Sequence, residues 1–313
     1  MGLASTPTAL FFSLILMGFG YALTDMSLNS QAVVAEKLLK KRWMSSFHGM
    51  WSLGSFITTI FGGFMIAHMT PGKNLVLVAI ASLLAFIFTS RFLIPPDRDE
   101  HSGSDDEITS AKIPFFGKPS LPLWAIGLGL IGGLISEGAA SDWGAILLRD
   151  NMQISDAYYT SSFACFALAM ITSRFLGDKA LHRFGARNTV RWGGLLGGGG
   201  WALCLAIAIP LSNIESMRTL ALVIADLGFI CAGLGIGPMF PAFILAASRV
   251  PGVAPAVAIS RVGVIGIAGY FIGPTVTGLI AQISSLSWAM AYPICALLLA
   301  GFMSRAISTE AKI

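Results

Sequence analysis

Residues 177–191 read GDKALHRFGARNTVR, a short basic segment between two long apolar runs. Those runs, at about 157–177 and 190–210, are each close to the roughly 20 residues that a helix needs to cross a bilayer. The glycines of the segment permit a tight turn and a close approach between backbones. The segment therefore predicts a loop between two membrane-spanning helices.

The composition of the whole chain supports this interpretation. Of its 313 residues, 55% are hydrophobic and 12% are charged, about half the charged fraction of a typical soluble domain. We therefore expect an all-α integral membrane protein that contacts the lipid bilayer. Nine spans are expected, at about 8–33, 44–68, 74–94, 122–147, 157–177, 190–210, 219–246, 254–283 and 287–304.

The basic residues predict the orientation of these spans. Sixteen of the 20 lysines and arginines, with Arg174 counted among them, fall in one set of loops. The opposite set contains Lys73, Arg149 and Arg218. Because short cytoplasmic loops carry an excess of Lys and Arg, we expect a multi-pass protein of the inner (plasma) membrane with a cytoplasmic C-terminus. The same clustering between apolar runs argues against a nucleic-acid partner.

Three parts of the chain are expected. Residues 96–121 are acidic and contain Pro, Ser and Gly, the composition of a solvated linker. The linker separates a three-helix part, 1–95, from a six-helix part, 122–313.

The two helical parts share a repeat at an offset of 215 residues. It aligns four pairs of glycines over two successive helices, namely Gly18 with Gly233, Gly20 with Gly235, Gly54 with Gly269 and Gly63 with Gly278. This favours a parallel repeat of six-helix halves, an arrangement in which transporters bind substrate between the halves. The repeat partner of the loop 177–191 would precede Met1, so we expect about three helices to be missing before the first span.

The loop resembles the cytoplasmic loop signature of the major facilitator superfamily. The matching residues are Gly177, Asp178, Arg183, Gly185 and Arg187. The stretches GFGYALTDMSLNSQAVVAEK, MSSFHGMWSLGSF and SEGAASDWGAILL are similar to the fourth, fifth and seventh helices of the bacterial YbjJ-like branch of that superfamily.

The resemblance implies a secondary transporter with a twelve-helix bundle, of which this chain corresponds to helices four to twelve. It also implies that the five loop residues form a conformational latch between transporter states; a basic loop that only sets topology is the alternative. We expect a monomer that moves a small-molecule substrate by alternating access, and we expect this transport to be coupled to protons. A truncated and inactive fragment is the alternative function.

Polar residues within the spans are candidates for a substrate or proton cavity, because ionisable groups in a membrane are costly. Asp25 and Asn29 share one helix face, and the alternative is a polar contact between helices. His48 is a candidate for a proton relay or an ordinary interfacial histidine. Arg261 could extend to the cytoplasm, bind an anionic substrate group or pair with a carboxylate.

The run LISEGAASDWGAILL, residues 134–148, contributes three further candidates. Glu137 and Asp142 lie about 140° apart around a helix, so they face different neighbours. Glu137 is near the middle of its span and is the stronger cavity candidate. Asp142 and Trp143 lie nearer the outer surface and could serve an outer gate or meet water.

Enzymatic chemistry is not expected from this sequence. It has no HExxH pair and no plausible Ser/His/Asp set. The glycine-rich stretch GGLLGGGGWA lacks the Gly-Lys-Ser/Thr of a phosphate-binding loop and is instead expected to let helices pack closely. The four cysteines lie far apart in apolar runs without CxxC spacing. No cofactor and no metal ion are therefore expected.

Overall fold

A computed structural model describes residues 2, 4–66, 68–95, 113–155 and 158–307, and these contain helices and no β-strand. Most of the expected linker, residues 96–112, lies outside the described residues. The helices are α1 (Pro7–Leu39), α2 (Met44–Ile66), α3 (Pro71–Thr89), α5 (Leu121–Ile146), α6 (Ser161–Trp192), α7 (Gly198–Ser212), α8 (Arg218–Ile236), α9 (Met239–Ala247), α10 (Pro255–Ile283), α11 (Leu286–Ala289) and α12 (Ala291–Met303).

Helices occupy most of each range that was expected to span the membrane, but α6 also extends through the expected loop at residues 177–191. Over the described residues, seven helical stretches are long and apolar enough to cross a membrane, compared with the nine spans expected. One of the seven, Ser161–Ser212, contains both α6 and α7, and α2 is not among them. Inside α6 the backbone turns sharply at Gly185, whose φ of 76° favours glycine. The expected turn between two helices is therefore present, although hydrogen bonding continues across it.

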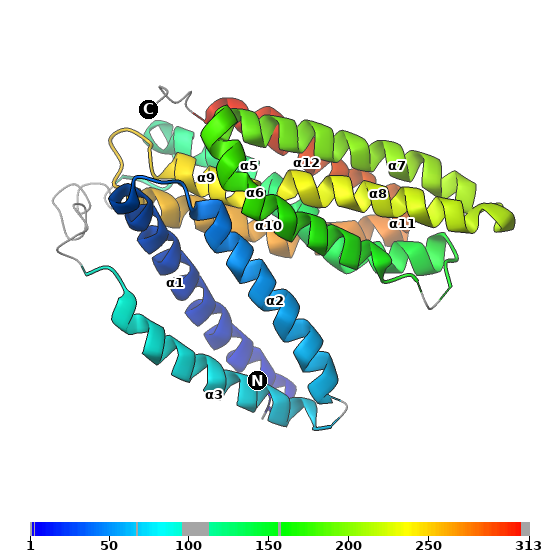
Figure 1. Ribbon diagram of the computed structural model, residues 1–313, viewed down its shortest axis with the longest axis horizontal. Helices are drawn as coiled ribbons and strands as arrows, with labels where there is room; N and C mark the ends of the chain where they lie inside the picture. Colours follow the sequence, from blue (N-terminus) through cyan, green and yellow to red (C-terminus); the bar gives the residue numbers. More distant parts are fainter. Residues whose placement is uncertain (1, 3, 67, 96–112, 156–157, 308–313) are drawn as a thin grey trace.

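The helices form two groups that meet near one end and diverge toward the other (Figure 1). The first group is α1, α2 and α3, and the second is α5 to α12. The burial of side chains along α1 agrees with this arrangement. The buried residues of α1 are Asn29, Val33, Val34 and Glu36, all in its second half. On the first half, large side chains such as Phe12 and Leu16 are exposed, at 64% and 72%.

Helix α5 lies at the centre of the second group and packs against α10, α12, α9 and α6. Its Ser136 hydroxyl donates within the helix to the Gly132 carbonyl and across to the Pro293 carbonyl of α12, both at 2.7 Å. A Cβ at Gly132 would lie 2.5 Å from the Ala296 carbonyl oxygen. Small residues therefore permit the close approach of α5 and α12.

The glycine-rich stretch expected to serve packing forms a π-helical turn, η5 (Gly193–Gly197), followed by α7. A Cβ at Gly235 of α8 would lie 2.3 Å from the Gly193 carbonyl oxygen, and one at Gly194 would lie 2.5 Å from the Gly301 Cα. These glycines thus join α8 and α12 to η5 through backbone contact.

We expect Gly235→Ala to lower the thermal unfolding midpoint of the detergent-solubilised protein, because overpacking a close contact costs about 1–3 kcal/mol. Gly199→Ala is the matched control, since a Cβ there meets nothing within 4 Å. Equal midpoints for the two variants would contradict the close packing of α8 against η5.

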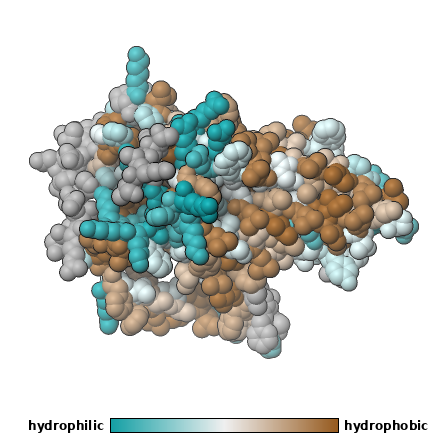
Figure 2. Space-filling model, turned by 45° about the horizontal axis from the view of Figure 1, so that its top comes forward, coloured by the Kyte–Doolittle hydropathy of each residue, from teal (hydrophilic) through white to brown (hydrophobic). Residues whose placement is uncertain are grey.

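The surface has the character of a membrane protein. Figure 2 shows hydrophilic side chains gathered toward one end of the molecule, while much of the rest of that face is hydrophobic. Large apolar side chains are exposed along several helices, among them Phe11, Leu83, Leu84, Leu196, Leu203 and Phe271. A lipid bilayer is the environment in which such a surface is stable.

Candidate functional site

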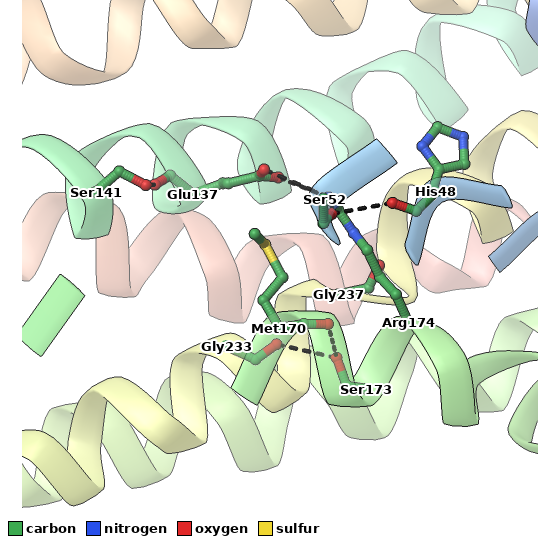
Figure 3. Close-up of polar contacts among 9 residues, drawn as sticks. All are labelled: His48, Ser52, Glu137, Ser141, Met170, Ser173, Arg174, Gly233 and Gly237. Atoms are coloured by element: carbon green, nitrogen blue, oxygen red, sulfur yellow. Dashed lines mark hydrogen bonds and ion pairs between the residues drawn. The ribbon is translucent and has the colours of Figure 1, made fainter. Parts of the chain in front are cut away.

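Arg174 of α6 is the centre of a polar cluster in which both helix groups take part (Figure 3). Its side chain is buried, and no other lysine or arginine among the described residues is. Its Nε donates to the Gly237 carbonyl at 3.3 Å, and its Nη1 donates to the Ser52 hydroxyl of α2. Its guanidinium also lies 5.8 Å from the Trp51 ring centroid. Arg174 therefore joins α2 to the second group.

Glu137 of α5 supplies the negative charge of this cluster. Its carboxylate oxygens lie 3.3 and 3.4 Å from Arg174 Nη2, and the two side chains are 6% and 3% exposed. Burying two charges is costly unless they are paired, and the pair satisfies that condition. Tyr21 of α1 and Tyr270 of α10 also lie within electrostatic range of Glu137 and Arg174. The expected cavity residue Glu137 is thus paired with the buried arginine that joins α6 to α2.

A second set of contacts joins α1 to α2. The Asn29 amide donates to the Asp25 carbonyl at 2.8 Å and to the Asp25 carboxylate at 3.3 Å. Asn29 Oδ1 lies 3.1 Å from His48 Nε2, and the His48 ring packs 4.7 Å from the Phe240 ring of α9. Asp25, Asn29 and His48 therefore form one chain of polar contacts that ends against the second group. Their role in a cavity stays a prediction.

Asp178 of α6 binds the amino-terminal end of α2. Its carboxylate accepts the backbone N–H groups of Ser45 and Ser46, each at 2.9 Å, and the Ser46 hydroxyl. The Ser45 hydroxyl donates to the Arg174 carbonyl at 2.6 Å. A carboxylate is favourable at a helix N-terminus, where unpaired N–H groups and the helix dipole both attract it. This contact joins the two groups at the end where they meet.

Glu36, near the end of α1, accepts the two N–H groups that precede Ser45 at the start of α2. Its Oε1 accepts from Trp43 at 2.6 Å and from Met44 at 2.8 Å. Nearby, Arg42 Nη1 donates to the Leu181 carbonyl of α6 at 2.9 Å. Four successive N–H groups at the start of α2 are thus bound by two carboxylates, one from each group.

The other residues of the expected latch loop have different contacts. Gly177 permits the approach of α2, because a Cβ there would lie 2.1 Å from the Ser45 hydroxyl. Gly185 forms the turn described above. Arg183 is exposed with its guanidinium 5.4 Å from the Phe184 ring centroid, and Arg187 is half-buried beyond the turn. Gly177 and Asp178 therefore make the contacts with α2.

Three cavity candidates lie apart from the cluster around Arg174. Asp142 is exposed on α5. Trp143 packs against α10, where its Nε1 donates to the Pro274 carbonyl at 3.2 Å. Arg261 donates to the carbonyls of Ile113 and Pro114, at the start of the segment that leads into α5. These contacts join Arg261 to residues of the expected linker, and the three roles considered for it stay predictions.

A family comparison places these contacts in context. The sequence pattern described as Major Facilitator Superfamily matches residues 1–257. The chain belongs to this superfamily. Its membership supports a membrane transporter rather than an enzyme, and it agrees with the resemblance of the loop at residues 177–191.

Three relatives of the chain have names that agree with this membership. An uncharacterized MFS-type transporter of Yersinia pestis is 28% identical over 310 residues, which cover 98% of this chain and 74% of the relative. An uncharacterized transporter of Sinorhizobium fredii is 28% identical over 288 residues, covering 91% and 71%. The membrane protein MosC of Rhizobium meliloti is 25% identical over 297 residues, covering 93% and 66%.

The sequence did not identify Arg174 as the central residue of the cluster. Arg174 was counted with the loop residues because it lies near the expected end of its span. It lies four residues before Asp178, on the same helix face, and that spacing is the available signal. Ser52 was not among the site candidates either.

Proposed function

We propose that the chain acts as a secondary active transporter that moves a small solute across the inner membrane by alternating access coupled to protons. The observation that carries this proposal is the contact of Asp178 with the start of α2. It joins the two helix groups at one end, while the helices diverge toward the other (Figure 1). A rocking motion between two groups needs such a contact, one that can form and separate as a unit.

The basic loops support an assignment of the two ends. The loops containing Lys40, Lys41 and Arg249 lie at the end where the groups meet. By the positive-inside rule this is the cytoplasmic end. The conformation is then closed toward the cytoplasm and open toward the outside. Gly177, Asp178, Arg183, Gly185 and Arg187 form the latch of this conformation in the proposal.

Proton coupling is supported by the carboxylates within the spans. Glu137 is buried beside Arg174, and Asp25 is half-buried on α1. Carboxylates inside a membrane bundle are suited to bind and release protons during transport. The cavity of the proposal is lined by these two residues with Asn29 and His48.

The test begins with a deletion strain grown on a panel of solutes, followed by uptake of each hit into liposomes that contain the full chain. With the outside made acidic, we expect uptake to exceed that without a pH gradient, and a protonophore to abolish the excess. Uptake that is indifferent to the gradient would overturn the coupling. A protein that moves no hit above empty liposomes would overturn transport by this chain.

A further inference from the structure

We infer that the Glu137–Arg174 pair is the binding site of the transported solute, and that this solute carries one carboxylate that replaces Glu137 on the Arg174 guanidinium. The inference rests on the proposed transport function and specifies its substrate class. It starts from the arrangement of charges in the cluster.

The three nitrogens of the Arg174 guanidinium have different partners. Nη1 donates to the Ser52 hydroxyl, and Nε donates to the neutral Gly237 carbonyl at 3.3 Å. Nη2 contacts Glu137 at 3.3 and 3.4 Å, whereas charge-assisted hydrogen bonds are usually about 2.7–2.9 Å. The Nη2 side is therefore the part of Arg174 on which an exchange of carboxylates costs least.

Three aromatic side chains near the pair are partly exposed. Tyr21, Trp51 and Tyr270 all lie around Glu137 and Arg174. Each exposes more than a third of its area, at 51%, 48% and 38%. They belong to α1, α2 and α10, so both helix groups contribute to the site. A small organic anion that enters between the groups thus meets amphipathic rings first and the guanidinium behind them.

Charge balance links this exchange to a proton. The pair is neutral when Glu137 is ionised, and a second carboxylate on Arg174 would leave one uncompensated negative charge in a buried site. Protonation of Glu137 from the water on the side of entry restores neutrality. Among the described residues, Arg174 on α6, Tyr270 on α10 and Tyr21 on α1 interact with Glu137, while His48 on α2 interacts with Arg174 and Asp25 on α1 interacts with Tyr21. One proton therefore accompanies each monovalent anion.

The test measures binding directly and does not depend on transport. Glu137→Gln resembles the protonated state and leaves Arg174 without its buried counter-ion. We expect acetate, butyrate and benzoate to raise the thermal midpoint of this variant more than acetamide, butyramide and benzamide do. The larger midpoint rise with the carboxylates should correspond to binding at least about ten-fold tighter than that of the amides, as expected of a hydrogen bond to a charged group. Because Glu137→Gln lacks the carboxyl group that would take up the proton, its midpoint rise with carboxylates is expected to be independent of pH between about 5.5 and 8.

The double variant Glu137→Gln/Arg174→Gln is the control, since it lacks the charge that would bind the anion. It is expected to respond equally to acids and amides. If the three carboxylates raise the Glu137→Gln midpoint no more than their amides, the inference is wrong. If the double variant shows the same preference for carboxylates, the site is elsewhere and the inference is again wrong. Proton-driven uptake of a cationic or neutral hit would also overturn it while leaving the proposed transport function intact.

Discussion

Asp178→Asn is expected to shift the protein toward a conformation in which α2 and α6 are separated at their joined end. The substitution replaces a carboxylate that accepts two backbone N–H groups and the Ser46 hydroxyl. Asparagine has one acceptor oxygen, and its NH₂ group would face donors. Loss of a hydrogen bond to a charged group costs about 1.5–3 kcal/mol, so the equilibrium should shift by about ten- to one-hundred-fold.

Spin labels on the two sides of this contact measure the shift. Lys41 and His182 are exposed, and each neighbours one partner of the hydrogen bond between Arg42 and Leu181. In a background without the four native cysteines, labels at these positions should be close in the parent protein. In Asp178→Asn a second population at longer distance should appear.

Lys179→Gln is the matched control, because it removes an exposed charge next to Asp178 without altering the contact with α2. It should leave the distance distribution unchanged. If Asp178→Asn gives the same distribution as this control, then the carboxylate does not hold the two groups together.

The contact between Asp178 and the start of α2 could be predicted from the sequence only in part, for a physical reason. Apolar runs of bilayer length and a basic loop with two glycines are local patterns, so the helices and the turn at Gly185 could be predicted. The family resemblance identified Asp178 as part of a latch. The partner of Asp178, the start of α2, is more than 130 residues away along the chain. No local pattern encodes that contact.

The residues of the candidate site also could be predicted only in part, because their partners are distant along the chain. Glu137 was expected in a cavity because a carboxylate in the middle of a span needs a polar environment. Its partner Arg174 was assigned to a loop, since distance from the end of a span was the only available guide to burial. Arg261 was interpreted as a cavity candidate by the same guide, and its contacts lie at Ile113 and Pro114. A charge near a helix end can be buried or extend to water, and packing against other helices decides which.

The largest loss of stability is expected when one member of the buried pair is removed alone. Arg174→Gln leaves the Glu137 carboxylate without a counter-ion in a site that is 6% exposed. Removing one partner of a buried pair costs about 3–5 kcal/mol, whereas replacing both partners by neutral residues of similar size is often nearly neutral. Glu137→Gln should also destabilise the protein. The double variant is expected to be more stable than Arg174→Gln.

The four proteins to compare are the parent, the two single variants and the double variant. Their equilibrium unfolding is measured in mixed detergent micelles with an increasing fraction of a denaturing detergent. The four unfolding free energies give the coupling free energy of the pair. Asp142→Asn is the control, because it neutralises an exposed carboxylate five residues along the same helix and should change stability by less than about 0.5 kcal/mol. If the losses from the two single variants add in the double variant, Glu137 and Arg174 do not stabilise each other. A coupling of several kcal/mol would instead mean that each charge is tolerated in the bundle because of the other. That is also the condition under which an incoming carboxylate could take the place of Glu137.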